Sequence, residues 1–415
     1  MKKLLLVWPV ATPVYHSDFW RNAWMYEMES YLADNLVNYE VSIFDGSKET
    51  SYEKYVNLIT KESFDFILCV APLDSFDGFY KAISYTRLCS SKSKILVYGL
   101  ACYLDNEYFK SLDIDAFTYS GDFESSVISY VNGIDDVKII SGVYIKQDNS
   151  WIKTPQGKYL VPDQWKFARI NRIKDMDVVR LTIAKGCVGN CLFCCCPILH
   201  GINERRMDTV NVIEYLRKIK QECSSDIIVE FAAPSFTSNR DWVINFCDEI
   251  VKQNIDIKWR CVTRIDMLDN DLIHKMSEAG CYRIGLGLET LSKEEQKNIR
   301  KGFCVEKTKS IIESMLINSI EPLIFLIAAL PGQKLDDFAH TYKEVKQWGG
   351  TPRITSYVNY RALSFMDSIS VSMESNMTTS SLKGYNEEER RKYMQLILNT
   401  CDDDSIQKYK FTKQT

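Results

Sequence analysis

Short apolar runs alternate with longer amphipathic segments through the first 135 residues of the chain. The apolar runs resemble the strands buried in parallel sheets, and they predict strands at residues 3–8, 40–45, 65–70, 94–99 and 116–119. Helical patterns fill the intervals, at residues 18–35, 51–62, 77–90 and 122–132. This alternation predicts a doubly wound, Rossmann-like α/β domain over residues 1–135. Ligands of such sheets bind beyond the carboxyl ends of the strands, here the loops at 9–13, 72–75, 99–102 and 121–124.

A second alternation of strand and helix signals begins near residue 178. Its six strands are expected at residues 179–184, 227–231, 257–261, 282–288, 323–330 and 353–360. Its helices are expected at residues 208–223, 240–254, 270–279, 292–300, 305–318 and 335–349. Residues 136–177 predict a linker, extended or hairpin in structure, that bridges to this second domain. The second domain covers residues 178–373, and residues 374–415 predict a tail with one helix at 386–400.

Composition narrows the classes of function. The chain has 415 residues, 46% of them hydrophobic, so it can bury a substantial core, and its net charge of −4 gives no electrostatic case for nucleic acid or an anionic membrane as a partner. No apolar run approaches the roughly 20 residues that cross a bilayer. Residues 1–9 imitate a signal peptide, but the apolar run is too short and no cleavage site follows. The scattered cysteines predict a reducing, cytoplasmic location.

Three closely spaced cysteines follow the first strand of the second alternation. Cys187, Cys191 and Cys194 have the spacing C-x3-C-x2-C. This spacing suits three irons of one iron–sulfur cube and leaves the fourth iron open to a small molecule. Zinc sites favour two C-x2-C pairs, and no second pair follows here. Chance clustering among 14 cysteines is another alternative, and Cys195, which is followed by Cys196, could replace Cys194 as a ligand.

The cysteine motif, with the aromatic Phe193 before its third member, resembles that of the radical SAM superfamily. In that family, the amino and carboxylate groups of S-adenosylmethionine (SAM) chelate the open iron of a [4Fe-4S] cluster. Further segments at 259–266, 279–290, 299–302 and 325–332 resemble the family's later strands, with an alanine replacing the first glycine of a Gly-Leu-Pro-Gly stretch. The resemblance covers residues 178–360 and implies a partial (β/α)6 barrel with the cluster at its carboxyl-end face. Only Cys401 lies in the tail, so a single cluster is expected.

The resemblance implies roles for residues at the ends of these strands. Glu289 can accept hydrogen bonds from ribose hydroxyls or the SAM ammonium, and Arg264 can form a bidentate pair with the SAM carboxylate, for which Lys301 or Arg300 is a second candidate. The alternative for Arg264 and Glu289 is an internal salt bridge between neighbouring strands. After the second strand, alanines stand where an acid is common, so Glu230, Ser235 or backbone carbonyls would take its place. The implied SAM-binding set is Phe193, Glu230, Ser235, Arg264, Glu289, Lys301, Leu330 and Pro331.

An α/β domain ahead of such a barrel resembles the cobalamin-dependent branch of the superfamily. The opening Leu-Leu-Leu-Val-Trp-Pro run and the Gly-Asp-Phe-Glu turn at 121–124 carry this resemblance. No histidine lies between residues 45 and 102, so no D-x-H-x-x-G motif supplies a cobalt ligand, although His16 could reach a ligand. A vestigial or substrate-contacting domain is the alternative. The implied cobalamin contacts are Trp8, Pro9, Val10, Ser75, Gly99, Leu100, Gly121 and Glu124.

The resemblance implies an enzyme whose cofactors carry the difficult chemistry. The reduced cluster would cleave SAM to a 5′-deoxyadenosyl radical, the radical would take hydrogen from an unactivated carbon, and methylcobalamin would deliver a methyl group. The expected substrate is a small natural-product intermediate or a peptide, and an external donor such as flavodoxin or ferredoxin would supply electrons. One alternative is a cobalamin-free radical SAM enzyme that rearranges or oxidises its substrate or transfers another SAM-derived group. The other is a non-catalytic metal or redox protein.

Overall fold

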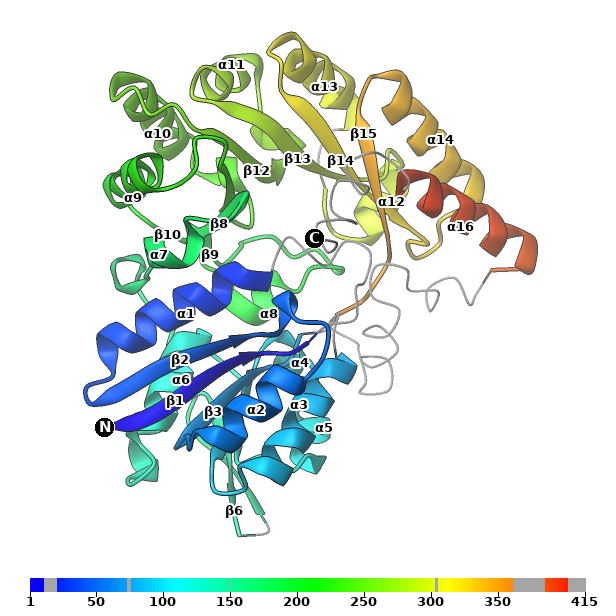
Figure 1. The fold of residues 1–415 in the computed structure, drawn as a ribbon. Coiled ribbons are helices and arrows are strands. Elements are labelled where there is room, and N and C mark those ends of the chain that lie inside the picture. The colour runs from blue at the N-terminus through cyan, green and yellow to red at the C-terminus, as the bar shows by residue number, and fades with distance from the viewer. Residues whose placement is uncertain (11–20, 73–75, 149, 303–304, 361–384, 402–415) are drawn as a thin grey trace.

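The computed structural model describes residues 1–10, 21–72, 76–148, 150–302, 305–360 and 385–401. They form two α/β units, each built on a sheet with parallel strands (Figure 1). The α/β fold class expected from the sequence is therefore confirmed. Within these residues, no helix is both long and apolar enough to span a membrane.

Seven strands form the first sheet, in the order β2-β1-β3-β4-β5-β6-β7. Strand β1 pairs in parallel with both β2 and β3, so the direction of winding reverses beside β1. In doubly wound folds, ligands bind outside the carboxyl ends of the strands at this switch point. The five parallel strands are β1 (Lys2–Trp8), β2 (Tyr39–Asp45), β3 (Phe66–Val70), β4 (Lys94–Tyr98) and β5 (Ala116–Thr118).

Helices cover both faces of this sheet because the central strand is apolar on both sides. Leu4 and Leu6 pack toward α1 and α6, whereas Leu5 and Val7 pack toward α2, α3 and α5. Figure 1 shows α1 on the side of the sheet that faces the second unit. The helices α4 and α5 lie between β4 and β5, where the sequence indicated only a loop. The helices are α1 (Arg21–Asn35), α2 (Glu53–Lys61), α3 (Phe76–Cys89), α4 (Leu100–Leu104), α5 (Asn106–Ser111) and α6 (Phe123–Asn132).

A hairpin of β6 (Val143–Gln147) and β7 (Ser150–Lys153) extends the first sheet by two antiparallel strands. These residues lie in the linker predicted over residues 136–177. The hairpin joins the sheet because its aromatic residues pack there: Tyr144 stacks on Phe117 of β5, with ring centroids 4.9 Å apart. Trp151 donates its Nε1–H to the backbone carbonyl of Lys110 at the end of α5. Residues 154–177 then lead to the second unit.

The second sheet has six parallel strands in chain order, β8-β11-β12-β13-β14-β15. Its helices cover the outer face, as in the partial barrel expected from the sequence (Figure 1). The strands are β8 (Val178–Thr182), β11 (Ile228–Ala232), β12 (Lys258–Arg264), β13 (Cys281–Glu289), β14 (Glu321–Ala328) and β15 (Thr351–Ser356). The helices are α9 (Thr209–Glu222), α10 (Arg240–Lys252), α11 (Asn270–Glu278), α12 (Lys293–Asn298), α13 (Thr308–Ile317) and α14 (Leu335–Gln347).

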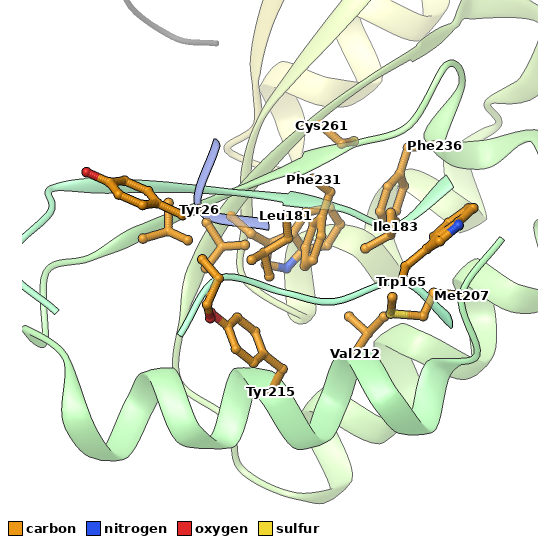
Figure 2. Packing of buried hydrophobic residues seen from close by; sticks show 14 of the residues in the cluster. Tyr26, Trp165, Leu181, Ile183, Met207, Val212, Tyr215, Phe231, Phe236 and Cys261 are labelled. Atoms are coloured by element: carbon orange, nitrogen blue, oxygen red, sulfur yellow. The ribbon is translucent and has the colours of Figure 1, made fainter. Parts of the chain in front are cut away.

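The two faces of this second sheet differ in chemistry. Side chains on its outer face are apolar, and Figure 2 shows Leu181 and Phe231 facing Val212 and Tyr215 of α9. On the inner face, Arg180, Glu230 and Arg260 occupy the same level of three adjacent strands. Glu230 accepts a 2.8 Å hydrogen bond from Arg260 and lies 3.5 Å from Arg180.

The helix α16 (Glu387–Cys401) follows the sixth strand and packs against β15 and α14. It lies in the tail predicted over residues 374–415. Its Tyr393 is fully buried and contacts Phe338 of α14, with ring centroids 5.4 Å apart. The helix therefore covers the last βα unit of the barrel.

The first unit covers the open edge of the barrel sheet. Helix α1 packs on β8, and the Glu27 carboxylate accepts a 2.9 Å hydrogen bond from the backbone N–H of Thr182. This contact satisfies a backbone donor on the side of β8 that has no neighbouring strand. Burial raises the pKa of Glu27 to about 7. Glu29, on the same helix, forms a salt bridge with Arg172.

Candidate functional site

The three-cysteine loop lies between β9 (Ala184–Lys185) and α8 (Cys196–His200), after the first strand of the barrel. Cys187 donates its backbone N–H to Gly201, and Leu192 donates to Ile299 at the end of α12. The loop is therefore anchored on two sides. Gly186, which starts it, has a φ of 85°, and a Cβ there would lie 2.0 Å from the carbonyl oxygen of Asn203. A residue other than glycine would displace the loop.

Backbone amides point at the sulfurs of this loop. Gly189 N–H donates to Cys187 Sγ at 3.3 Å, and Cys196 N–H donates to Cys194 Sγ at 3.4 Å. Hydrogen bonds to sulfur tune iron–sulfur clusters, so these donors fit a [4Fe-4S] cluster. In the described part of the chain, no three His, Cys, Asp or Glu side chains lie close enough to share one metal ion. In an iron–sulfur cube, by contrast, each cysteine holds its own iron.

The two following cysteines differ from each other. Burial raises the pKa of Cys195 to about 12, which keeps it a thiol. The Cys196 thiol hydrogen-bonds to Cys187, and with the Gly189 amide it lowers the pKa of Cys187 to about 6. Cys187 is thus held toward the thiolate form that ligates metals.

Four residues of the expected SAM-binding set converge beside this loop. Glu289, at the end of β13, forms a buried ion pair with Lys301. The Lys301 ammonium lies 5.5 Å from the centroid of the Phe193 ring, and Phe193 packs against a small apolar cluster that contains Leu330. A Cβ on Gly287 would lie 2.5 Å from Lys301 Nζ, so the missing side chain makes room for the ion pair.

Local backbone geometry aims Glu289 toward Lys301. The register between β13 and β14 shifts between Gly287 and Glu289, and Glu289 has a φ of 67°. A non-glycine residue in this left-handed region is strained, and such strain clusters at functional sites. The irregular end of β13 therefore changes the direction of a carboxylate that a regular strand would present differently.

Arg264 lies at the same carboxyl-end edge of the barrel sheet, and its ion-pair partner is Asp266. Its guanidinium forms two 2.9 Å hydrogen bonds with Asp266 and donates at 3.2 Å to the carbonyl of Lys301. Arg264 and Glu289 thus each form an internal ion pair, as the alternative expected, but their partners are Asp266 and Lys301. Pro331 is exposed at the tip of the turn that begins with Leu330.

Two other expected SAM contacts are held by the protein itself. Glu230 is buried between Arg180 and Arg260 on the inner face of the barrel. Ser235 is 4% exposed, and its hydroxyl lies 2.9 Å from Thr263 Oγ1. We expect both groups to stabilise the barrel.

The carboxyl edge of the first sheet presents mostly buried side chains. Trp8, the last residue of β1, and the following Pro9 and Val10 are buried, and Val10 donates its N–H to Tyr52 at 3.0 Å. Trp8 Nε1 is a buried donor with no hydrogen-bond partner among the described residues. Such a group can bind a ligand acceptor, and this is the feature of the edge that fits a corrin. Ser75 and His16 lie outside the described residues.

The two glycines expected to line a corrin site each lie close to another backbone segment. Gly99 has a φ of 136°, and a Cβ there would lie 2.7 Å from the carbonyl oxygen of Ala71. Gly121 has a φ of 80°, and its Cβ would lie 2.5 Å from the carbonyl carbon of Gly157. Both glycines allow close approach of two chain segments. Leu100, next to Gly99, begins α4 and is half-buried.

Glu124 and Asp122 connect the first unit to the cysteine loop. Glu124 accepts a 2.6 Å hydrogen bond from Lys185, two residues before Cys187. Burial lowers the pKa of Lys185, but Glu124 and Asp122 raise it, so the net shift is upward. Glu124 therefore has a partner within the protein, and its expected role as a corrin contact stays a prediction.

Arg205 makes a second buried connection between the units. It donates to both carboxylate oxygens of Asp122, at 2.6 and 3.1 Å, and to the carbonyls of Leu160 and His200. Asp122 has a fully buried side chain. Burial alone would raise the pKa of Asp122, but Lys185 and Arg205 lower it by more, so the net shift is downward. This connection could not be predicted from the sequence because its members lie far apart along the chain.

Comparison with protein families gives a match to the radical SAM superfamily over residues 181–345. The chain is 25% identical over 164 residues to an uncharacterised methyltransferase of Pyrococcus horikoshii, a match that covers 40% of this chain and 36% of that protein. It is 23% identical over 387 residues to the anaerobic magnesium-protoporphyrin IX monomethyl ester cyclase of Rubrivivax gelatinosus, which covers 86% of this chain and 68% of the cyclase.

Two solved structures share both units of the fold. TsrM from Kitasatospora setae, a radical SAM methyltransferase solved with cobalamin and a [4Fe-4S] cluster, matches with a TM-score of 0.69 and 13% identity. The match covers 86% of this chain and 72% of TsrM. The cobalamin-dependent enzyme OxsB, solved with aqua-cobalamin and SAM, matches with a TM-score of 0.71 and 15% identity, over 98% of this chain and 56% of OxsB. The chain therefore spans less than two thirds of OxsB and of the Pyrococcus protein.

Proposed function

Because residues 181–345 match the radical SAM superfamily, we propose that the chain is a cobalamin-dependent enzyme that methylates an unactivated carbon of a small molecule or a peptide. The observation that carries the proposal is the convergence of the Glu289–Lys301 pair, Phe193 and Leu330 beside the three-cysteine loop. When bound, the cluster and SAM supply a 5′-deoxyadenosyl radical for hydrogen abstraction, and cobalamin supplies the methyl group.

The chain's own residues bind and orient these groups. Cys187, Cys191 and Cys194 hold the cluster, with amide donors at two of the sulfurs. Lys301 binds the SAM carboxylate, and Glu289 binds ribose hydroxyls or the SAM ammonium, each exchanging part of its present ion pair for the ligand.

The remaining SAM contacts come from three neighbouring elements. Phe193 and Leu330 provide an apolar wall for the adenine, and exposed Pro331 borders it. Arg264, held by Asp266, adds positive charge at the carboxylate end.

Cobalamin binding is supported by the two-unit fold shared with TsrM and OxsB, and by the switch point beside β1, where Trp8 Nε1 is unpaired. Methyl transfer is supported by the methyltransferase name of the Pyrococcus relative. We further propose an external electron donor such as flavodoxin or ferredoxin, and a cytoplasmic location, because an iron–sulfur cube persists in a reducing environment.

A radical SAM enzyme without cobalamin is the second candidate. One observation favours it: Gly99, Gly121 and Glu124, at the edge where a corrin would lie, are each engaged by the protein itself. Such an enzyme would rearrange or oxidise its substrate, or transfer another part of SAM.

Anaerobic reconstitution with iron, sulfide and hydroxocobalamin tests the proposal. We expect the visible spectrum to show both a cluster and a corrin, and dithionite with SAM to yield 5′-deoxyadenosine, measured by liquid chromatography. Triple substitution of Cys187, Cys191 and Cys194 by alanine should abolish the cluster and the product. The matched control, with alanines at Cys195 and Cys196, should keep both.

Each failure has its own meaning. A cluster and 5′-deoxyadenosine without retained corrin would favour the second candidate. A wild-type protein that forms no cluster would contradict radical chemistry altogether and favour a non-catalytic metal or redox protein. Loss of the cluster in the control variant would contradict the ligand assignment.

A further inference from the structure

The turn after β14 has an alanine in a conformation that favours glycine. Residues 329–332 read Ala-Leu-Pro-Gly, and Ala329 has a φ of 60°. The left-handed region brings Cβ close to the following carbonyl oxygen, so an alanine populates it far less readily than a glycine. Some contact must therefore hold Ala329 in this conformation.

Gln333 makes that contact. Its side-chain oxygen accepts a 2.7 Å hydrogen bond from the N–H of Ala329, and its side-chain amide donates to Glu295 at 3.0 Å and to the carbonyl of Ile327 at 3.3 Å. Gln333 is 3% exposed. One buried side chain thus bonds to the backbone before the turn and at its first residue.

The C-terminal helix segment holds Gln333 in turn. Tyr385 donates its hydroxyl to the backbone carbonyl of Gln333 at 2.8 Å, and Tyr393 of α16 donates to its side-chain oxygen at 3.3 Å. Tyr393 is fully buried against Phe338. The contact chain runs from α16 through Gln333 to Ala329.

The turn positions Leu330 in the SAM site proposed above. Leu330 is 1% exposed and packs with Ile299 and Ile327 in the cluster that Phe193 contacts. A change at Ala329 would move Leu330 relative to Phe193 and the Lys301 ammonium beside it.

We propose that Gln333 is a positioning residue for SAM: it holds Ala329 in the left-handed conformation and thereby places Leu330 against the ligand. This inference rests on the proposed function, because it concerns the same SAM site. It assigns α16, through Tyr393, a part in SAM affinity.

A double-mutant cycle on the reconstituted full chain tests the role. The variants are Gln333→Met, Ala329→Gly and the double variant, and the measurements are the dissociation constant of SAM and the thermal unfolding midpoint. Gln333→Met should raise the dissociation constant about tenfold, the order of the left-handed penalty of an alanine. Ala329→Gly alone should leave it within about twofold, because glycine adopts this conformation freely. The double variant should recover most of the lost affinity while remaining less stable than wild type.

The outcomes separate this inference from the proposed function. A wild-type chain that does not bind SAM would contradict the proposed function. Wild-type binding with unchanged affinity in Gln333→Met would overturn the positioning role, as would a loss that Ala329→Gly does not rescue. Should Gln333→Met fail to fold, Tyr393→Phe replaces it in the same cycle. Tyr393→Phe removes the hydroxyl that donates to the Gln333 side-chain oxygen. A loss of affinity rescued by Ala329→Gly is again required.

Discussion

The carboxyl-end edges of the two sheets use similar residues for different purposes. At the barrel edge, side chains from separate elements meet at one place: Phe193 from the cysteine loop, Glu289 from β13 and Lys301 from the segment after α12. At the edge of the first sheet, Gly121 closes against Gly157 and Glu124 bonds to the stem of the cysteine loop. A topology that can hold a ligand and a set of residues that binds one are therefore separate observations.

The largest effect expected from this comparison concerns Arg205, because it bonds to a fully buried carboxylate. Arg205→Ala should lower the free energy of unfolding by about 3–5 kcal/mol, since it removes the hydrogen-bonded ion-pair partner of a buried carboxylate. Urea unfolding of the metal-free protein measures this loss. Arg240→Ala is the matched control, because its pair with Asp269 is about half exposed and should contribute less than about 1 kcal/mol. Equal effects in the two variants would contradict a structural role for the edge of the first sheet.

A second prediction concerns the pH dependence of the contact between the units. The pKa of Glu27 rises from 4.5 to about 7 on burial, so between these pH values the folded chain binds a proton that the unfolded chain does not. Stability from this group is present below pH 4.5 and is lost as pH rises through 7. Glu27→Gln keeps an acceptor for Thr182 N–H and removes the titration. At pH 8, the variant should be more stable than wild type by roughly 2–3 kcal/mol.

The measurement is the difference in unfolding free energy between Glu27→Gln and wild type, taken from pH 4 to pH 8. The difference should grow as pH rises. A difference that is constant over this range would show that Glu27 does not titrate between these values.

A third prediction compares two buried glutamates, Glu230 and Glu289, which were both expected to contact SAM. Glu289→Gln should weaken SAM binding by about 1.5–3 kcal/mol, the range for a hydrogen bond to a charged group, whereas Glu230→Gln should leave the SAM dissociation constant unchanged. Glu230 lies between Arg180 and Arg260, so its loss should reduce stability instead. Equilibrium binding and thermal unfolding of both variants separate the two roles. Weaker SAM binding in Glu230→Gln would indicate that Glu230 contacts SAM.

The smallest effect concerns cobalamin. Trp8→Phe removes the unpaired buried Nε1 donor, and hydroxocobalamin affinity should fall by about 1 kcal/mol if this donor bonds to the corrin. Trp151→Phe is the control, because its Nε1 bonds to Lys110 at the opposite border of the sheet. Spectrophotometric titration of both variants measures the change. Unchanged affinity in Trp8→Phe would remove the residue-level support for a corrin at this edge.

Strands and helices could be predicted because each depends on a local pattern. The apolar residues of β1 are buried on both faces, and the strands of the barrel follow the apolar runs within a few residues. The three cysteines could be recognised for the same reason, since their spacing is local. Short helices without a full amphipathic repeat, such as α4 and α5, could not be predicted.

Partnerships between distant residues could not be predicted from a local pattern. Glu124 and Lys185 are 61 positions apart, and Tyr393 and Gln333 are 60 apart. A glycine at position 121 is visible in the sequence, but only the structure shows that Gly157 occupies the space where its side chain would lie. Glu230 and Glu289 are both buried on strands of the barrel, and only their ion-pair partners distinguish their expected roles.

The chain-order arrangement of the barrel strands has a consequence for biosynthesis. Each strand from β11 to β15 pairs with the strand synthesised before it, so the sheet can extend in one direction during translation, whereas β1 must wait for β3 to complete its pairing. Contacts between neighbours in the chain form early because little loop entropy is lost. The helix α16 emerges last and brings the tyrosine that bonds to Gln333. A nascent chain stalled before residue 385 would therefore contain every barrel strand and lack the last contact of the turn after β14.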